Sequence, residues 1–383
     1  MRPLRIAVLA HIRHPIAEPF RGGMEAHAHQ LVHGLADRGH DVTLFASGDS
    51  VVDVALRPLV PEHYDAVYPW HDFHGTDALN AHLDAAFEDC LPELAGFDVV
   101  HNNSLHRFPP RHAHSVGIPM ITSLHVPPFG ALQRAVHYAD APWIRYTACS
   151  DHLLQSYWPD GMTHRACVVP NGIDTSRWPV SQRGNGEAVW AGRITPNKAP
   201  HMAAHAARMA GIPLTIFGVI EHEDYFKDEL RPLLSQNIRY GGHVSSDDLA
   251  SVVSAASVFV FTPLWDEPFG LVAAEAMMCG TPVAAFDKGG VREVIGETGG
   301  ALAAAGDTQA LTGAIAQALS KDRLAVARDA RFRLSAERML SAYEAHYSAA
   351  MDAAKVENRV STFERGDSKS ASASAASRIA MNL

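Results

Sequence analysis

The regular alternation of short apolar runs with helical stretches is the feature that most constrains how this chain folds. The apolar runs, which suit buried strands, lie at 6–10, 42–46, 97–100, 119–124, 145–149 and 167–169, and then at 188–191, 213–217, 238–240, 258–261 and 282–286. Helical patterns lie between several of them, at 24–38, 77–91, 198–210, 246–256, 269–279 and 307–320. Repeated strand–helix units predict an α/β fold with parallel, doubly wound sheets.

The strand–helix units form two series that meet at a polar, glycine-containing stretch, Ser181–Gly186. A chain of 383 residues is also too long for one ordinary core. We therefore predict two Rossmann-like domains, at 1–180 and 186–345. Residues 346–383 are expected to hold the end of a terminal helix and a disordered tail rich in Ser and Ala. Because ligands bind beyond the carboxyl ends of such strands, the domains are expected to face a central cleft that holds the ligand.

The charge and hydropathy of the chain exclude several classes of partner. The formal net charge is −10, which argues against nucleic acid as a partner. No apolar stretch reaches the roughly 18 residues of a membrane span, and the N-terminus runs directly into a strand, so we expect a cytoplasmic protein. Residues 1–178 hold 12 Arg and no Lys against 19 Asp and Glu. They therefore lack a basic face for anionic lipids, and we expect no membrane association.

The spacing of cysteine and histidine gives no metal signature. The four cysteines are far apart without a C-x-x-C, and we expect them to be free and mostly buried thiols. The pairs His27-x-His29 and His112-x-His114 lack a third ligand at a suitable spacing. No Asp-x-Asp motif occurs either. We therefore predict that no metal is bound.

The most informative stretch is Thr262–Met277, which follows an apolar strand and opens a helix. A helix that begins directly after a strand presents free N–H groups and the positive end of its dipole, which suits a phosphate. Gly270 at the helix start would let a ligand approach the backbone. Glu267 and Glu275, eight residues apart, could each accept hydrogen bonds from vicinal hydroxyls. By spacing alone, however, two glutamates near a helix start are explained as readily by the helix dipole.

Three other segments follow strands in the same way. Arg193 and Lys198 are the only cations in Trp190–Lys198, and they could stabilise a departing diphosphate or be ordinary solvated surface cations. Gly22-Gly23 precedes a helix directed at the cleft, although a Gly-Gly turn alone is weak evidence. His125 ends the strand at 119–124, and Gly218 follows the strand at 213–217. A structural histidine is the simplest explanation for most of the 18 histidines in residues 1–178.

These motifs together resemble the retaining glycosyltransferases of family 4. That family carries E-P-F-G-L-x-x-x-E where this chain has Glu267–Leu271 with Glu275, and G-R-x-x-x(x)-K where it has Arg193 and Lys198. The resemblance covers about residues 4–345. It implies the GT-B fold, in which the first Rossmann-like domain lies on the acceptor side and the second binds a nucleotide sugar.

The resemblance also implies roles for individual residues. It places Arg193, Lys198, Glu267 and His125 among the catalytic groups, with Arg193 and Lys198 clamping the diphosphate. It implies donor contacts from the loop glycines, the start of the helix after Glu267, and the second glutamate of the motif: Gly22, Gly23, Gly218, Phe269, Gly270, Leu271, Val272 and Glu275. No nucleophile for a double displacement appears in the motifs, so front-face attack by the acceptor is favoured.

The expected activity is therefore transfer of a hexosyl group from a nucleotide diphosphate sugar to a hydroxyl of a small-molecule or saccharide acceptor that is soluble. UDP-glucose is the first candidate donor and GDP-mannose the second, and no cofactor is expected. Two alternatives stay open at this stage. One is another GT-B-like enzyme, a phosphorylase or a sugar-nucleotide epimerase, and the other is a two-lobed protein that binds a ligand without chemistry.

Overall fold

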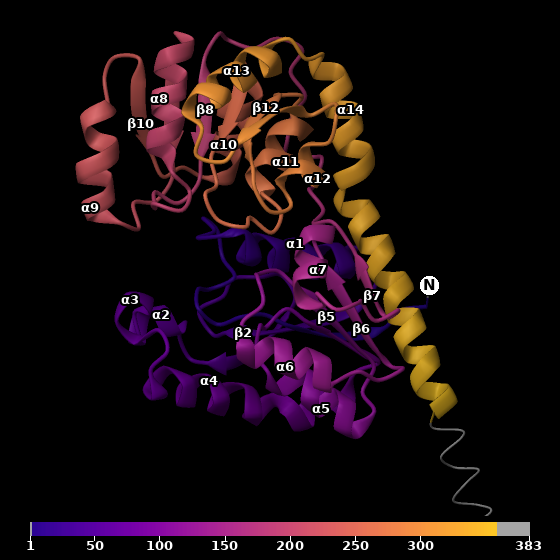
Figure 1. Cartoon of the computed structure of the whole chain (residues 1–383). Coiled ribbons are helices and arrows are strands. Elements are labelled where there is room, and N and C mark those ends of the chain that lie inside the picture. Colours follow the sequence, from indigo (N-terminus) through magenta and orange to yellow (C-terminus); the bar gives the residue numbers. More distant parts are fainter. Residues whose placement is uncertain (1, 358–383) are drawn as a thin grey trace, which may run out of the picture.

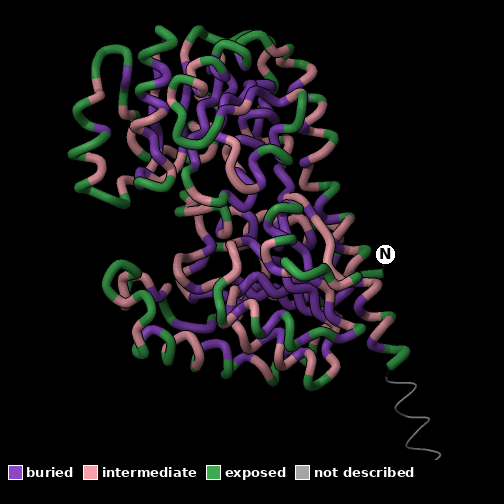
Figure 2. The backbone as a smooth tube through the Cα atoms, in the orientation of Figure 1, coloured by how far each residue is buried: buried purple, intermediate pink, exposed green. Residues whose placement is uncertain are grey.

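A computed structural model describes residues 2–357 of the chain. The expected disordered tail lies outside the described residues. The described part forms two lobes, each built around one sheet, with the buried backbone concentrated in the middle of each lobe (Figures 1 and 2). The predicted α/β class and the two parallel, doubly wound sheets are confirmed.

The first lobe contains a seven-stranded sheet in the order β3-β2-β1-β4-β5-β6-β7, in which every pair is parallel. Its strands are β1 (Arg5–Leu9), β2 (Asp41–Ser47), β3 (Ala55–Val60), β4 (Val99–Asn102), β5 (Met120–Leu124), β6 (Ile144–Ala148) and β7 (Ala166–Val168). Its helices are α1 (Gly23–Asp37), α2 (Tyr64–Val67), α3 (Trp70–Phe73), α4 (Asp77–Cys90), the 3₁₀ turn η1 (Leu91–Gly96), α5 (Phe108–Val116), α6 (Gly130–Tyr138) and α7 (Asp151–Tyr157).

The second lobe contains a six-stranded parallel sheet in the order β10-β9-β8-β11-β12-β13. Its strands are β8 (Ala188–Ala191), β9 (Leu214–Phe217), β10 (Ile238–Gly242), β11 (Val258–Phe261), β12 (Val283–Asp287) and β13 (Gly300–Ala304). Its helices are α8 (Pro200–Ala210), α9 (Glu223–Tyr225), η2 (Phe226–Leu230), η3 (Arg231–Leu233), α10 (Ser246–Ala255), α11 (Leu271–Met278), α12 (Val291–Ile295), α13 (Thr308–Leu319) and α14 (Arg323–Leu334).

The central strands form because they are short, wholly apolar runs that can be buried on both faces. Every residue of β8 and of β11 is buried, as is typical of a parallel sheet covered by helices on both sides. Both sheets also reverse their strand order at the same place, between β1 and β4 in the first and between β8 and β11 in the second. Ligands of doubly wound sheets bind at such switch points, beyond the carboxyl ends of the strands.

Two strands were not predicted, and both stand at the edge of a sheet. β3 carries Arg57 and Pro58, and a proline is tolerated there because an edge strand need not donate every ladder bond. β13 consists of Gly, Ala and Leu, which have little β-propensity, and it is defined by its pairing with β12. Neither strand has a local pattern that distinguishes it from a loop.

The C-terminal helix returns to the first lobe. Residues 336–357 are helical, and Figure 1 shows this yellow helix running from the second lobe down along the first. Met339, Leu340 and Tyr343 pack in one core cluster with residues of β1 and α1. The Glu344 carboxylate accepts hydrogen bonds from Arg38 at 2.5 Å and His40 at 3.0 Å. The division predicted from the sequence assigned residues up to 345 to the second domain, whereas these side chains lie against the first sheet.

Candidate functional site

A cavity of about 890 Å³ lies between the two lobes at the carboxyl ends of both sheets. Its size falls in the range of small-molecule sites. All of the site residues singled out from the sequence line it: His125, Arg193, Lys198, Glu267, Gly22, Gly23, Gly218, Phe269, Gly270, Leu271, Val272 and Glu275. Gly22 of the first lobe and Glu275 of the second, which lie 253 positions apart in the sequence, are thus brought to one cleft by the shared strand order.

The start of α11 is built to leave its first amide groups accessible. Gly270 caps the helix with φ at +91°, in the left-handed region that favours glycine. A Cβ at Gly270 would lie 2.8 Å from Cε1 of Phe261, so a larger residue would also collide with the preceding strand. The first amides of a helix have no intrahelical partner. Those of Leu271 and Val272 therefore offer an anion site where the helix dipole is positive.

Lys198 and Glu267 form an ion pair inside the cleft. The Lys198 Nζ contacts Glu267 Oε2, and Trp265 Nε1 donates a hydrogen bond of 2.9 Å to the same oxygen. The side chains of Lys198 and Glu267 are only 15% and 9% exposed. The ammonium group also lies 5.1 Å from the centre of the Trp265 ring. The lysine is therefore held in position by a neighbour that a bound ligand could replace.

Arg193 is held in a similar way, but closer to solvent. Its Nη1 atom donates to Glu221 Oε2 at 2.6 Å, and its side chain is 38% exposed. The other oxygen of Glu221 lies 3.5 Å from Arg13 Nη2, which comes from the first lobe. One carboxylate of the second lobe thus connects cations from both sides of the cleft. The sequence contained no signal for Glu221, because the pairing is long-range.

Gly218 keeps the end of β9 close to the end of β8. Its φ is +140°, and a Cβ there would lie 1.8 Å from the carbonyl oxygen of Gly192. Any side chain would therefore push apart the two loops that carry Arg193 and Gly218. The glycine allows both backbones to line the cleft at close approach.

Glu275 points into the cleft from the second turn of α11. Among the described residues it has no hydrogen bond or ion pair. Burial raises the pKa of this carboxyl to about 7, and the more distant Arg177 opposes the shift only in part. A desolvated carboxylate without a partner is costly, and it is satisfied when a ligand brings hydroxyl donors.

His125 stands at the end of β5 and is held neutral. Burial, reinforced by the adjacent His27, moves its pKa well below the usual value. Its Nε2 lies 2.9 Å from Asn103 Oδ1, which identifies this nitrogen as the N–H donor and leaves Nδ1 as an acceptor. Asn103 follows β4 and was not identified from the sequence. Its partnership with His125 joins neighbouring strands and has no local signature.

The Gly22-Gly23 loop brings the start of α1 against the start of α11. A Cβ on Gly23 would lie 2.7 Å from Cδ1 of Leu271, so the glycine lets the lobes meet here. Glu25, in the first turn of α1, is 4% exposed and lines the cleft, with Oε1 3.3 Å from His11 Nε2. Sequence reasoning did not select Glu25. Its place three residues after Gly22 on a helix directed at the cleft was the available signal.

A second set of contacts joins the lobes beside the cleft. Ser150 Oγ donates to the Pro268 carbonyl at 2.7 Å, directly beside Glu267. Glu293 of α12 accepts from the backbone N–H groups of Asp151 and His152 at 2.6 and 2.9 Å. A residue of the second lobe thus caps α7 of the first. We define these two contacts as the interlobe latch.

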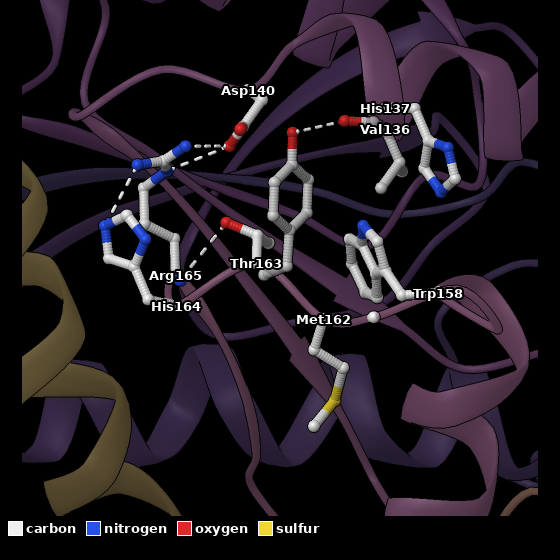
Figure 3. A pocket seen from close by; sticks show the side chains of 10 residues that line it. Val136, His137, Asp140, Trp158, Met162, Thr163, His164 and Arg165 are labelled. Carbon is white, nitrogen blue, oxygen red and sulfur yellow. Dashed lines mark hydrogen bonds and ion pairs between the residues drawn. The ribbon is translucent and has the colours of Figure 1, made fainter.

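Two further features lie outside the cleft. A hollow of about 480 Å³ between α6 and the segment before β7 is lined by Trp158, Met162 and their neighbours (Figure 3). Its polar groups bond one another, including Arg165 with Asp140, and Tyr146 with the Val136 carbonyl at 2.8 Å. The other feature is Asp49, Glu62 and His63, whose potential ligand atoms lie within 4.8 Å of one another. Neither feature contains a residue predicted for the site.

No helix in residues 2–357 is both long and apolar enough to cross a membrane.

Comparison with known families assigns each lobe to a family profile. Residues 21–177 match the profile described as Glycosyltransferase Family 4, and residues 179–336 match Glycosyl transferases group 1. The two matches are adjacent and meet close to the linker predicted from the sequence.

Curated relatives resemble the chain over most of its length. A glycogen synthase of Mycobacterium tuberculosis is 29% identical, with 82% of this chain and 87% of the relative covered. A D-inositol 3-phosphate glycosyltransferase of Mycolicibacterium smegmatis is 27% identical, with 85% and 86% covered.

Solved structures share the fold. AviGT4, a glycosyltransferase involved in avilamycin A biosynthesis, superposes with a TM-score of 0.67 at 20% identity, covering 91% of this chain and 98% of that one. Anabaena HepE in complex with UDP-glucose gives 0.68 at 17% identity, covering 90% of this chain and all of that one.

Proposed function

The chain belongs to glycosyltransferase family 4, a retaining family with the GT-B fold. From this premise we propose that it moves a hexosyl group from UDP-glucose to a hydroxyl of a soluble acceptor. Transfer from a nucleotide sugar follows from the family. The choice of UDP-glucose is supported by HepE, a neighbour of the same fold solved with that donor. GDP-mannose is the second candidate.

The observation that carries the proposal is the arrangement around the start of α11. The free amides of Leu271 and Val272, the ammonium of Lys198 and the guanidinium of Arg193 all line one cavity. Cations and helix amides together suit a diphosphate. Glu275, further along the same helix, would accept hydrogen bonds from the ribose hydroxyls.

The reaction follows from this placement by front-face substitution. The bond between the anomeric carbon and the diphosphate oxygen breaks, and a bond to the acceptor oxygen forms on the same face. The acceptor proton passes to the departing phosphate oxygen, so charges balance without a protein base. Lys198, Arg193 and the helix amides stabilise the negative charge that develops on the diphosphate.

Glu267 and His125 would hold the sugar. Glu267 is bonded to Lys198 in this structure, so donor binding would exchange this pair for contacts of Lys198 with phosphate and of Glu267 with sugar hydroxyls. The neutral His125 can offer the free lone pair on Nδ1 without adding charge near the anomeric carbon.

Donor binding and product analysis test the proposal. Titration calorimetry with UDP-glucose and GDP-mannose should show binding of UDP-glucose in the absence of acceptor. NMR of the product should show retained anomeric configuration.

Three results would contradict the proposal. Release of sugar phosphate on addition of inorganic phosphate would indicate a phosphorylase. A change in the sugar of the donor without any acceptor would indicate an epimerase. Binding of the nucleotide sugar without any turnover would indicate a two-lobed binding protein.

A further inference from the structure

The first-lobe side of the cleft carries apolar residues whose role is not explained by donor binding. Leu83 and Leu105 are partly exposed there, and four buried residues of the core cluster lie in the same wall. We call these six residues the acceptor shelf: Ile12, Tyr64, Leu79, Leu83, Phe87 and Leu105. They come from the loop after β1, from α2 and α4, and from the loop after β4. The shelf lines the same cleft as the predicted diphosphate site on α11.

The loop after β4 hides its polar atoms and presents a leucine. Ser104 Oγ donates to Asn102 Oδ1 at 2.6 Å and accepts from the His106 N–H at 3.1 Å. Between these anchors Leu105 has φ at +60°, a left-handed conformation that leucine rarely adopts. Such outliers persist where the surroundings enforce them, often at ligand sites. Here the strain places an apolar side chain on the cleft wall.

The charges around the shelf are already compensated. Arg107 pairs with Asp84 at 2.5 Å, and His106 bonds the other oxygen of Asp84 at 3.0 Å. Arg13 pairs with Asp65 at 3.4 Å and with Glu221. Among the described residues, Arg21 is the first-lobe arginine of the cleft without an ion pair. It is exposed directly before the Gly22-Gly23 loop, which is predicted to contact the donor, and it is not one of the shelf residues.

Two buried histidines of this side of the cleft, His14 and His106, are also uncharged near neutral pH. Burial lowers the pKa of His14 and of His106 to about 4 in each case. An acceptor carrying a phosphate would need unpaired cations at this wall. A polysaccharide would need many free donors and acceptors beside the shelf, whereas the Ser104 hydroxyl there is bonded within its own loop.

We propose that the acceptor is an uncharged hydroxyl compound with a largely apolar body, such as a phenolic or alkyl aglycone, which lies on the acceptor shelf. The proposal rests on the proposed function, and it deepens that function by naming the acceptor class. The buried Glu25 and His11 at the inner end of the cleft supply the polar contacts for the reacting hydroxyl.

Matched acceptors test the shelf. With UDP-glucose as donor, octyl β-glucoside below its micelle concentration is compared with methyl β-glucoside, because the two differ only in the alkyl chain. The shelf predicts a kcat/KM for the octyl compound at least about tenfold higher, since burial of two methylene groups would already supply that factor. Glucose 6-phosphate and maltotetraose should be poorer acceptors than the octyl compound.

Two variants connect the preference with the shelf. In Leu105→Asn the new residue tolerates the left-handed conformation but is polar, so the octyl-to-methyl ratio should fall toward one. Leu83→Gln on α4 should act in the same direction and covers the case in which the first variant does not fold. Leu319→Asn replaces a leucine on α13, 45% exposed and outside the cleft, and should keep the ratio.

Several outcomes would overturn the proposal. These are equal rates with both glucosides, preference for glucose 6-phosphate or maltotetraose, an unchanged ratio in both shelf variants, or transfer only to lipid in anionic vesicles. If calorimetry shows no binding of either nucleotide sugar, the proposed function fails as well. That failure is distinguishable, because it is measured before any acceptor is added.

Discussion

The two edges that face each other across the cleft share a strand order but differ in chemistry. The first-lobe edge presents neutral imidazoles, such as His14 and His125, beside an apolar shelf. The second-lobe edge presents ionisable groups, with Lys198 and Arg193 in ion pairs and with Glu275, which has no ion pair within residues 2–357. A fold fixes where the loops gather, whereas the residues on those loops decide which ligand each side can hold.

The difference follows from the cost of burying charge. A neutral imidazole can be buried near the reacting atoms while it still forms hydrogen bonds. A cation in the same place needs a partner, and on the second lobe the partners are Glu267 and Glu221. The second lobe thus keeps its cations positioned for an anionic ligand, and the first lobe lines the cleft with neutral imidazoles and with arginines that, apart from Arg21, are in ion pairs.

The largest expected effect on the charged edge of the second lobe comes from removing its buried cation, Lys198. Lys198→Ala should lower kcat by about 100- to 1000-fold while changing KM less, because the diphosphate gains charge mainly in the transition state. Steady-state kinetics would measure the loss, and circular dichroism would confirm folding.

Lys227→Ala, which replaces an exposed lysine outside the cleft, is the matched control and should keep normal turnover. Arg193→Lys should also be poorly tolerated, since lysine cannot reproduce a forked contact. Near-normal kcat in both cleft variants would mean that the charged edge does not serve the diphosphate.

Glu275 offers a second and smaller perturbation of the charged edge. Glu275→Gln should weaken donor affinity by about 10- to 100-fold, because hydrogen bonds to a charged group contribute about 1.5–3 kcal/mol. Since burial raises its pKa to about 7, donor affinity of the native enzyme should rise as pH increases through that value. Calorimetry at several pH values would show whether the variant loses this dependence.

The same group affects stability with the opposite trend. The folded protein binds this proton more tightly than the unfolded chain, so the contribution of Glu275 to the free energy of unfolding falls as pH rises from 4.5 to about 7 and is level above it. The variant should lack this decline. Glu229→Gln on the surface should retain both pH trends, and identical trends in all three proteins would refute the assignment.

A variant of the interlobe latch tests whether the contact between Glu293 and α7 stabilises the protein. Glu293→Ala removes the acceptor for two N–H groups at the start of α7 and should lower the free energy of unfolding by about 0.5–1 kcal/mol, because the carboxylate is exposed. Denaturant unfolding would measure this, with Glu297→Ala as the matched control. Equal free energies of unfolding of the two variants would show that the Glu293 contact of the latch contributes nothing to stability.

The smallest expected effect is that of chelation. The charged edge supplies its own cations, so transfer should keep its rate in EDTA within experimental error. A complete loss of activity that a divalent cation restores would show that the cations of the second lobe are insufficient.

The parts of the fold that sequence analysis predicted are those with local signals. β8 and β11 were predicted with their observed bounds, because each is a fully apolar run between turns. The loops that line the cleft were found because glycine, lysine and glutamate directly follow such runs. Asn103 and Glu221 were not selected, because what distinguishes them is a partner after another strand or in the other lobe. Glu25 was also missed, although its place three residues after Gly22 was a local signal.

The last helix is a second case in which a local pattern does not predict a long-range contact. Apolar residues at 339, 343, 347 and 350 follow a helical spacing and predict one buried face. That spacing does not say which sheet the face covers. The answer depends on contacts with β1 and α1, which lie more than 300 positions earlier in the chain.

The return of residues 336–357 to the first sheet makes the second lobe an insertion within the first. The polypeptide crosses between the lobes twice, once before β8 and once after α14, so two chain segments connect the lobes instead of one. A chimera that exchanges donor lobes between relatives therefore needs two junctions, one near 180 and one near 335. A simple truncation after the first junction would leave the face of the first sheet that Tyr343 and Tyr347 cover open to water.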